Sequence, residues 1–146
     1  MRMDIGSAKT VAWVCKRSNT PFRGAHVTNS LALGHNRLAI VDLNPEGEQP
    51  FHDEDSNIHA VVNGELYGYE EIRDRLSGEG YKFTSQSDSE IALALYKKHG
   101  VSFLSHLRGE FSICLYDSHA QTFIAACDRY AIKPMYYTVL DGKLLV

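Results

Sequence analysis

The period of the hydrophobic pattern changes at residues 63–65, and this change limits the folds open to the chain. Residues 58–62 (IHAVV) are an apolar, β-branched run typical of a strand, and the NGE stretch that follows is expected to end it. From Tyr69 apolar residues recur at helical spacing, with Gly78 or Gly80 as the stop. The sequence therefore predicts a strand followed directly by a helix.

Two further segments predict regular structure before residue 100. Residues 31–43 (LALGHNRLAIVDL) are expected to form two extended pieces joined at Gly34-His35. The SDSE stretch at 87–90 has the spacing of a capping box, with Ser87 as N-cap and a glutamate three residues later. A second helix is therefore expected from this point to the KKHG stretch, where cations and a glycine favour a helix end.

After Gly109 the pattern is that of strands. Residues 110–117 and 122–127 alternate around a polar turn, and residues 135–146 predict a hairpin with an Asp-Gly turn. Residues 10–15 are a further short candidate strand. Helices placed between groups of strands indicate an α/β (α+β) fold, built as a layered sandwich.

Length, charge and cysteine content narrow the classes of protein. The 146 residues suit one domain, and a net charge of −3 gives no electrostatic reason to expect nucleic acid or an anionic membrane as a partner. Cys15, Cys114 and Cys127 are odd in number and widely spaced, so neither a disulfide framework nor a metal site is expected. Without a signal peptide or an apolar span in the sequence, a cytoplasmic location is expected.

Asn63 and Gly64 are the first candidates for a functional role. A side-chain amide beside a glycine N–H places two hydrogen-bond donors together, which is the minimum for an oxyanion hole in acyl transfer. Glycine also permits close approach of a substrate to the backbone. The alternative is an ordinary turn in which neither residue contacts a ligand.

Three charged residues are candidates for binding the carboxylate and the ammonium group of an amino acid. The guanidinium of Arg37, in an apolar stretch, could bind a substrate carboxylate in a bidentate manner or pair with a carboxylate of the protein. Glu65 and Asp88 could receive an ammonium group, although an acid at position 88 also suits the first turn of a helix. With the two oxyanion donors, these residues match an amino acid with an amide side chain, glutamine or asparagine.

Six motifs, in order, resemble one protein family. They lie within residues 31–137 and read LGHNRLAIVDL, GEQPF, VVNGELYGYEEIRDRL, SDSEIALALY, LRGEFSICLYD and DRYAIKPMYY. The series is similar to the class II glutamine amidotransferase domain of glutamine-hydrolysing asparagine synthetases. The resemblance implies a four-layer αββα N-terminal-nucleophile hydrolase sandwich, which is expected here to be incomplete.

The resemblance also implies a role for each candidate. Arg37 would bind the α-carboxylate of L-glutamine, Glu65 and Asp88 its α-amino group, and Asn63 with Gly64 the oxyanion. The expected partners are L-glutamine and either a synthetase domain or a second copy of the chain. No cofactor is expected in this chain, because ATP and Mg would belong to a synthetase domain whose pyrophosphate-loop motif is absent from the sequence.

The sequence departs from the family at its start. Family members begin, after removal of Met, with a Cys whose thiolate attacks the amide while its own α-amine acts as base. This chain begins Met1-Arg2-Met3, so residues 1–22 are expected to be an atypical N-terminal segment and 23–146 a partial amidotransferase type 2 domain, truncated at both ends. Cys15 has no free amine and is expected to be a buried strand thiol.

Three internal positions also differ from the family pattern. Cys127 and Ala131 occupy positions where the family usually has Arg and Gly, and Gly68 replaces an Asn. Two hypotheses about function follow. The first is a domain that binds glutamine and releases ammonia for asparagine biosynthesis, with turnover impaired by the missing N-terminal Cys. The alternative is a catalytically inactive fragment or glutamine-binding pseudo-domain, so whether this chain is an enzyme stays open.

Overall fold

The computed structural model describes residues 22–27, 31–37, 47–53, 57–141 and 143–146. For residues 22–27, 36 and 37 it describes the backbone alone. The candidate strand at 10–15, with Cys15, lies outside the described residues, as do residues 38–43 of the second expected extended piece.

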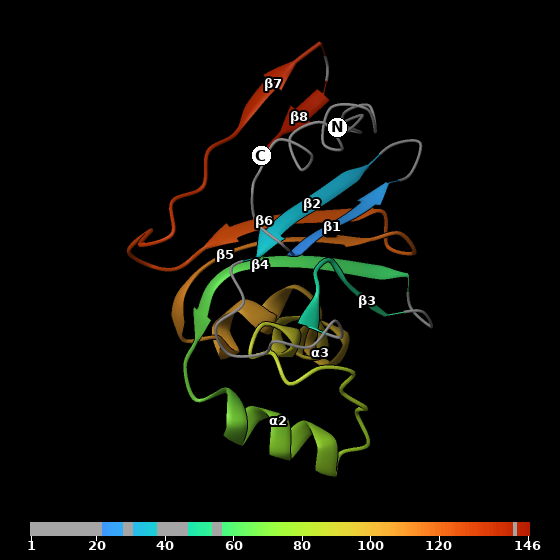
Figure 1. Cartoon of the computed structure of the whole chain (residues 1–146), viewed down its shortest axis with the longest axis vertical. Helices are drawn as coiled ribbons and strands as arrows, with labels where there is room; N and C mark the ends of the chain where they lie inside the picture. Colours follow the sequence, from blue (N-terminus) through green and yellow to red (C-terminus); the bar gives the residue numbers. More distant parts are fainter. Residues whose placement is uncertain (1–21, 28–30, 38–46, 54–56, 142) are drawn as a thin grey trace.

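A four-stranded antiparallel sheet forms the centre of the described structure (Figure 1). Its strands, in spatial order, are β3 (Phe51–Asp53), β4 (Ile58–Leu66), β5 (Gly109–Asp117) and β6 (Thr122–Cys127). Alternate residues of β4 and β5 point to opposite faces, as the pleat requires. The buried set on one face consists of Ile58, Ala60, Val62, Phe111, Ile113 and Leu115.

Helices cover this buried face of the sheet. They are α2 (Tyr69–Gly78), α3 (Glu90–His99) and the 3₁₀ helix η2 (Gly100–His106), and Figure 1 shows α3 directly below the sheet with α2 beyond it. Ile91, Leu95 and Phe103 are fully buried in the same cluster as the strand residues. The core therefore lies between the sheet and α3.

The opposite face of the sheet is covered by a hairpin of β1 (Phe22–Val27) and β2 (Ala32–Arg37). Leu33 and the adjoining Leu31 pack against Tyr116, Val61 and Cys114 of the sheet. A separate pair, β7 (Thr138–Leu140) and β8 (Lys143–Leu145), forms the expected hairpin near the C-terminus. Two strand layers and a helical layer form a mixed α+β sandwich, which confirms the predicted fold class.

Two predicted strand ends are wrong. β2 runs without interruption through Gly34 and His35, because both pair with β1 in a continuous antiparallel register. β4 does not stop at the NGE stretch but continues to Leu66, paired throughout with β5. Local turn propensity is overridden in both places by pairing with a neighbouring strand.

The predicted capping box is wrong in its contacts. Helix α3 begins at Glu90, and the Ser87 hydroxyl accepts the N–H of Ser89 at 3.3 Å. The Glu90 carboxylate instead accepts the N–H groups of Thr84 and Ser85 at 2.8 and 2.7 Å. The preceding turn offers backbone and hydroxyl donors together, so it binds this carboxylate. The predicted bounds of α2 and the end of α3 at His99 are confirmed.

Among the described residues, no helix combines the length and the apolar character required to span a membrane.

Candidate functional site

The outer edge of β4 is completed by a side chain rather than by a longer β3. The Gln49 amide Nε2 donates to the carbonyl of Val62 at 3.0 Å, and its Oε1 accepts the Val62 N–H at 2.6 Å. Both main-chain groups of one residue in an antiparallel strand point to the same side, and the side alternates along the strand. The buried Gln49 carboxamide therefore pairs with β4 as a neighbouring peptide group would.

Asp88 binds the same edge four residues further along. Its Oδ2 accepts the N–H of Leu66 at 2.8 Å, and its Oδ1 lies 3.4 Å from the hydroxyl of Ser89. The side chain comes from the turn before α3 and is buried. Position 88 therefore does more than complement a helix dipole, because it joins this turn to the end of β4.

Gly64 lies between these two side-chain contacts. By the alternation of the strand its N–H is directed to the same edge as those of Val62 and Leu66, which are roughly 13 Å apart along β4. Its φ is +133°, and a Cβ there would lie 1.9 Å from the carbonyl oxygen of Glu110. The close approach of β5 thus requires glycine at this position, whether or not a substrate also has to approach the backbone here.

Asn63 and Glu65 belong to the face of β4 opposite the helices, and both are exposed. In the sheet register Asn63 is opposite Ser112, and Glu65 is opposite Glu110. Like charges directly across an antiparallel pair are destabilising. Binding of a cation near Glu65 and Glu110, at this end of the sheet face, would therefore be favourable.

Arg37 is the last residue of β2, where its backbone pairs with Phe22. The hairpin that contains it lies on the same face of the sheet as the Asn63 side chain, opposite the helices. The structure describes the backbone of Arg37 but not its guanidinium. The structure thus brings Asn63, Gly64, Glu65 and Asp88 together at one end of β4. The binding roles of these four residues and of Arg37 stay predictions.

Arg73 of α2 holds the turn that contains Asp88. Its Nη1 donates to the carbonyl of Ser85 at 2.7 Å, and its Nη2 donates to that of Ser87 at 2.6 Å. On the other side of the turn, the Glu90 carboxylate accepts the hydroxyl of Ser85 at 2.6 Å. A cation and an anion therefore clamp the turn from both sides, which restricts where the Asp88 carboxylate can lie.

The segment after β6 is organised around another buried carboxylate, that of Asp128. It accepts the N–H of Phe111 at 3.2 Å and that of Tyr130 at 2.9 Å, with longer bonds from Ile132 and Lys133. Burial raises the pKa of Asp128, but these backbone donors outweigh it and hold the pKa below its usual value. Ala131 in this segment has φ +50°, in the left-handed region that favours glycine.

Two cysteines lie within the described residues, and they differ in exposure. Cys114 on β5 is half-buried, and this burial raises the pKa of its thiol to about 11. Cys127 at the end of β6 is exposed and is in register with Ser112, which is in turn opposite Asn63. A thiolate at neutral pH is therefore disfavoured at position 114.

The sequence patterns missed Gln49, Arg73 and Glu110. Gln49 is part of the GEQPF motif, yet nothing local indicates that its amide replaces a strand. Arg73 is one of several charges on α2. The only signal for Glu110 is its place after Gly109 at the start of a predicted strand.

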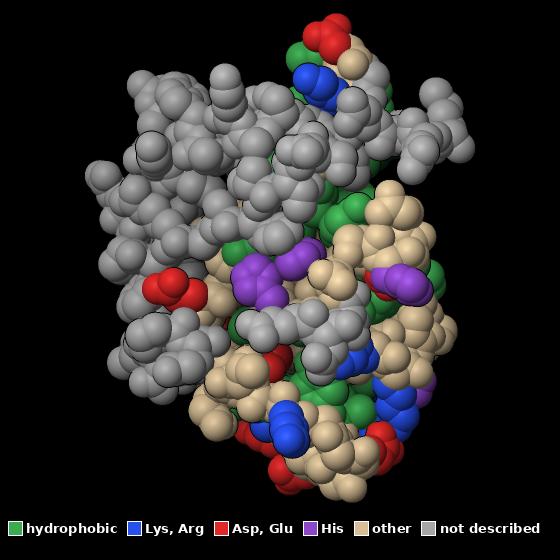
Figure 2. All heavy atoms as spheres, turned by 90° about the vertical axis from the view of Figure 1, so that its right-hand side faces the viewer, with side chains coloured by type: hydrophobic (Ala, Val, Ile, Leu, Met, Phe, Trp, Pro, Cys, Tyr) green, Lys and Arg blue, Asp and Glu red, His purple; other side chains and the backbone are tan. Residues whose placement is uncertain are grey.

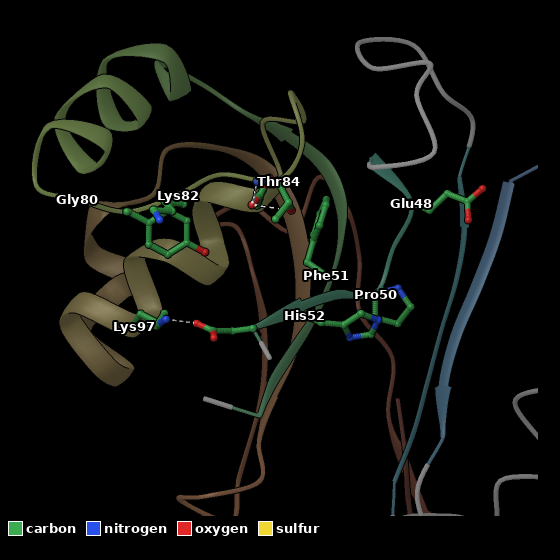
Figure 3. A pocket seen from close by; sticks show the side chains of 11 residues that line it. Glu48, Pro50, Phe51, His52, Gly80, Lys82, Thr84 and Lys97 are labelled. Carbon is green, nitrogen blue, oxygen red and sulfur yellow. Dashed lines mark hydrogen bonds and ion pairs between the residues drawn. The ribbon is translucent and has the colours of Figure 1, made fainter. Parts of the chain in front are cut away.

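A hollow of about 640 Å³ lies beside β3 (Figure 3). Phe51, Tyr81 and Thr84 line it, and Lys97 in its wall forms an ion pair with Asp53. Of the predicted site residues whose side chains the structure describes, Asn63, Gly64, Glu65 and Asp88, none lines this hollow. In the part of the chain that the structure describes, no three or more potential ligands gather into a metal centre.

Comparison with known families gives a match over nearly the whole chain. Residues 16–146 match the family model described as "Glutamine amidotransferase domain". In fold, the chain is similar to glutamine phosphoribosylpyrophosphate amidotransferase from B. subtilis, solved with ADP and GMP. The TM-score is 0.57 and the identity 26%, over 70% of this chain and 24% of that one.

Curated relatives fall into two groups by name. The Amidase chyE of Penicillium rubens is 59% identical over 117 residues, and the Amidase chry2 of Gibberella zeae is 60% identical over 116; each match covers 80% of this chain. Asparagine synthetase [glutamine-hydrolyzing] 2 of Bacillus subtilis is 37% identical over 120 residues, or 82% of this chain. The chain spans 16 to 17% of the length of these three relatives.

Proposed function

The chain belongs to the family of glutamine amidotransferase domains, and on that premise we propose that it binds L-glutamine at the outer edge of β4. This proposal depends on the position of Gly64, which lies between two residues of that edge whose main-chain groups are already hydrogen-bonded to side chains. Gln49 occupies the main-chain groups of Val62, and Asp88 occupies that of Leu66. The N–H of the intervening glycine is directed into the space that a carboxamide would enter.

Acidic side chains at this end of β4 would bind the α-ammonium group of the ligand. Asp88 is fixed by its bond to Leu66, and its second oxygen accepts a long hydrogen bond of 3.4 Å from Ser89, the one partner of that oxygen among the described residues. Glu65 follows the oxyanion residues directly, and Glu110 is opposite it. An ammonium placed among these carboxylates relieves their mutual repulsion. Arg37 is proposed to bind the α-carboxylate.

The side-chain carbonyl of glutamine would lie against Asn63 and Gly64. Attack on this carbon moves negative charge to the oxygen, which the Asn63 amide and the Gly64 N–H would stabilise. One such donor typically changes the rate of acyl transfer by about 10²–10³-fold. Completing hydrolysis then requires a thiolate to displace ammonia and water to release glutamate.

We propose that this 146-residue chain hydrolyses bound glutamine poorly. Cys114 is half-buried, with its thiol pKa raised to about 11 by burial. Cys127 lies two strand spacings from Asn63, or roughly 9–10 Å, too far for direct attack on a carbonyl held there. Within the described residues, no cysteine is therefore placed to act as the nucleophile. A glutamine-binding domain without turnover is the alternative form of this proposal.

Two acceptors for the released ammonia are candidates. The similarity to asparagine synthetases supports delivery to a synthetase domain for asparagine biosynthesis. The two relatives near 60% identity are named amidases, which supports amide hydrolysis with another acceptor. Both candidates use the same acyl-transfer site and differ only in the partner.

Calorimetric titration of the purified chain with L-glutamine tests the proposal. We expect saturable binding of L-glutamine, weaker binding of L-asparagine because its carboxamide is one methylene nearer the α-carbon, and glutamate release close to the uncatalysed rate. Absence of glutamine binding would overturn the binding proposal. Rapid glutamate release would leave binding intact and overturn the proposed impairment.

A further inference from the structure

Two histidines connect β3 to β4 on the face of the sheet away from the helices. His52 and His59 are direct partners in the register, and their Nδ1 atoms are 2.9 Å apart. The rings meet edge to face, with centroids 5.1 Å apart and an angle of 74° between their planes. His52 is exposed and His59 half-buried, and Figure 2 shows histidine side chains gathered near the middle of the side of the molecule that it presents.

We propose that His52 and His59 form a two-histidine site for a late first-row divalent cation, with Cu²⁺, Ni²⁺ and Zn²⁺ as the class of ligand. Imidazole nitrogen is a preferred donor for these ions. With metal–nitrogen bonds of about 2.0–2.1 Å, two nitrogens at this separation subtend an angle of about 90° at the metal. That angle suits two adjacent positions of a square-planar or octahedral ion, and a modest ring rotation opens it toward the tetrahedral value.

The same geometry explains why a cation would replace a proton. Two neutral rings at this distance share one proton, with one Nδ1 donating and the other accepting. Two protonated rings would place like charges in contact. For a metal ion to be bound by both Nδ1 atoms, the shared proton moves to Nε2 of its own ring, so that both imidazoles bind as neutral ligands.

Among the described residues no group of three or more metal-ligating side chains occurs, so the two histidines are the ligands that this part of the structure supplies. Cu²⁺ should bind more tightly than Ni²⁺ or Zn²⁺, following the usual order for nitrogen sites.

A bound ion would also hold β3 against β4. β3 has only three residues and pairs with β4 through Phe51, His52 and Asp53. A bond from both histidines to one metal would add a link across this short pair. Binding only to the folded state would then raise the unfolding temperature.

Calorimetry with CuCl₂, NiCl₂ or ZnCl₂ on the untagged chain tests the site. We expect one ion per chain and a rise in thermal midpoint, and either His52→Gln or His59→Gln should weaken binding by at least about tenfold. The matched control is the stacked pair His99 and His106, whose near-parallel rings, 18° apart, do not direct two nitrogens at one point.

His99→Gln should therefore bind the metal as the unchanged chain does. Equal loss in the control, or undiminished binding in both site variants, would overturn the proposal. A readout without substitution is the ¹⁵N spectrum of the histidine rings during Zn²⁺ titration. The Nδ1 resonances of His52 and His59 should shift together, and unshifted resonances at saturating Zn²⁺ would contradict the site.

Discussion

The Asp88 carboxylate accepts the N–H of Leu66 at 2.8 Å, which joins the turn before α3 to the last residue of β4 across 22 positions of sequence. One oxygen of this carboxylate therefore organises the fold, while the other remains near the proposed ligand. The same residue has both a structural and a proposed binding role, and the two can be separated by substitution.

Asp88→Asn retains an oxygen that can accept the Leu66 N–H but removes the negative charge. Because hydrogen bonds to charged groups are worth about 1.5–3 kcal/mol, the Kd for L-glutamine should rise about 10–100-fold. The free energy of unfolding should change by less than about 1 kcal/mol. Calorimetry and urea unfolding measure the two effects. Asp74→Asn, at an exposed acid of α2, is the control, and equal affinity in both variants would contradict the role of Asp88.

Arg73→Lys keeps the charge but loses the fork that binds the carbonyls of Ser85 and Ser87. We expect it to lower the free energy of unfolding by about 1–3 kcal/mol and to weaken glutamine binding, because the turn with Asp88 is less restricted. Arg75→Lys on the same helix is exposed and should change neither quantity. Unaltered glutamine affinity in Arg73→Lys would mean that the clamp does not position Asp88.

Gly64→Ala should destabilise the sheet strongly. The added Cβ would lie 1.9 Å from the Glu110 carbonyl oxygen, so β4 and β5 must separate locally. We expect a loss of more than about 2 kcal/mol in urea unfolding. Gly68→Ala is the matched control, because its φ is also positive but nothing lies within 4 Å of the new atom. That variant should lose only about 1 kcal/mol, and equal losses in the two variants would rule out the steric explanation.

Ala131→Gly should stabilise the chain. Ala131 has φ +50°, where an alanine is strained and a glycine is not, so a gain of about 1 kcal/mol is expected. Ala125→Gly in β6 should have the opposite sign, because glycine weakens the interior of a strand. Thermal unfolding of both variants checks the difference. If Ala125→Gly were stabilised and Ala131→Gly destabilised, the proposed backbone strain at Ala131 would be contradicted.

Asp128 should contribute to acid sensitivity. Its pKa is lowered in the folded chain by backbone donors, against the opposing effect of burial. Its charged form therefore stabilises the fold above the ordinary Asp value of 3.8, and this contribution is lost as the pH falls through the lower, folded pKa. Asp128→Asn should flatten the decline in unfolding free energy measured between pH 5 and pH 2. Asp141→Asn, in the exposed turn before β8, is the charge-matched control, and an unchanged slope in Asp128→Asn would refute the linkage.

Short-range patterns predicted much of the fold. The helical period from Tyr69 and the cations before Gly100 predicted α2 and the end of α3, because both depend on neighbours within one or two turns. Alternation predicted β5 and β6 for the same reason. The predicted end of β4 was wrong because Gly64 is a residue typical of turns, yet in the structure it pairs with β5 as a strand residue.

The period of each segment could be read from the chain alone, as could a set of polar residues suited to an amide-bearing amino acid. The contacts of three of the polar residues depend on packing between distant elements: Gln49 completes the edge of β4, Glu90 binds the turn at Ser85 instead of capping a helix, and Asp88 accepts the N–H of Leu66. The Gln49 and Asp88 contacts join residues 13 and 22 positions apart. The physical reason is that a buried polar atom takes whichever partner the packed elements bring within reach, and local periodicity contains no information about that partner.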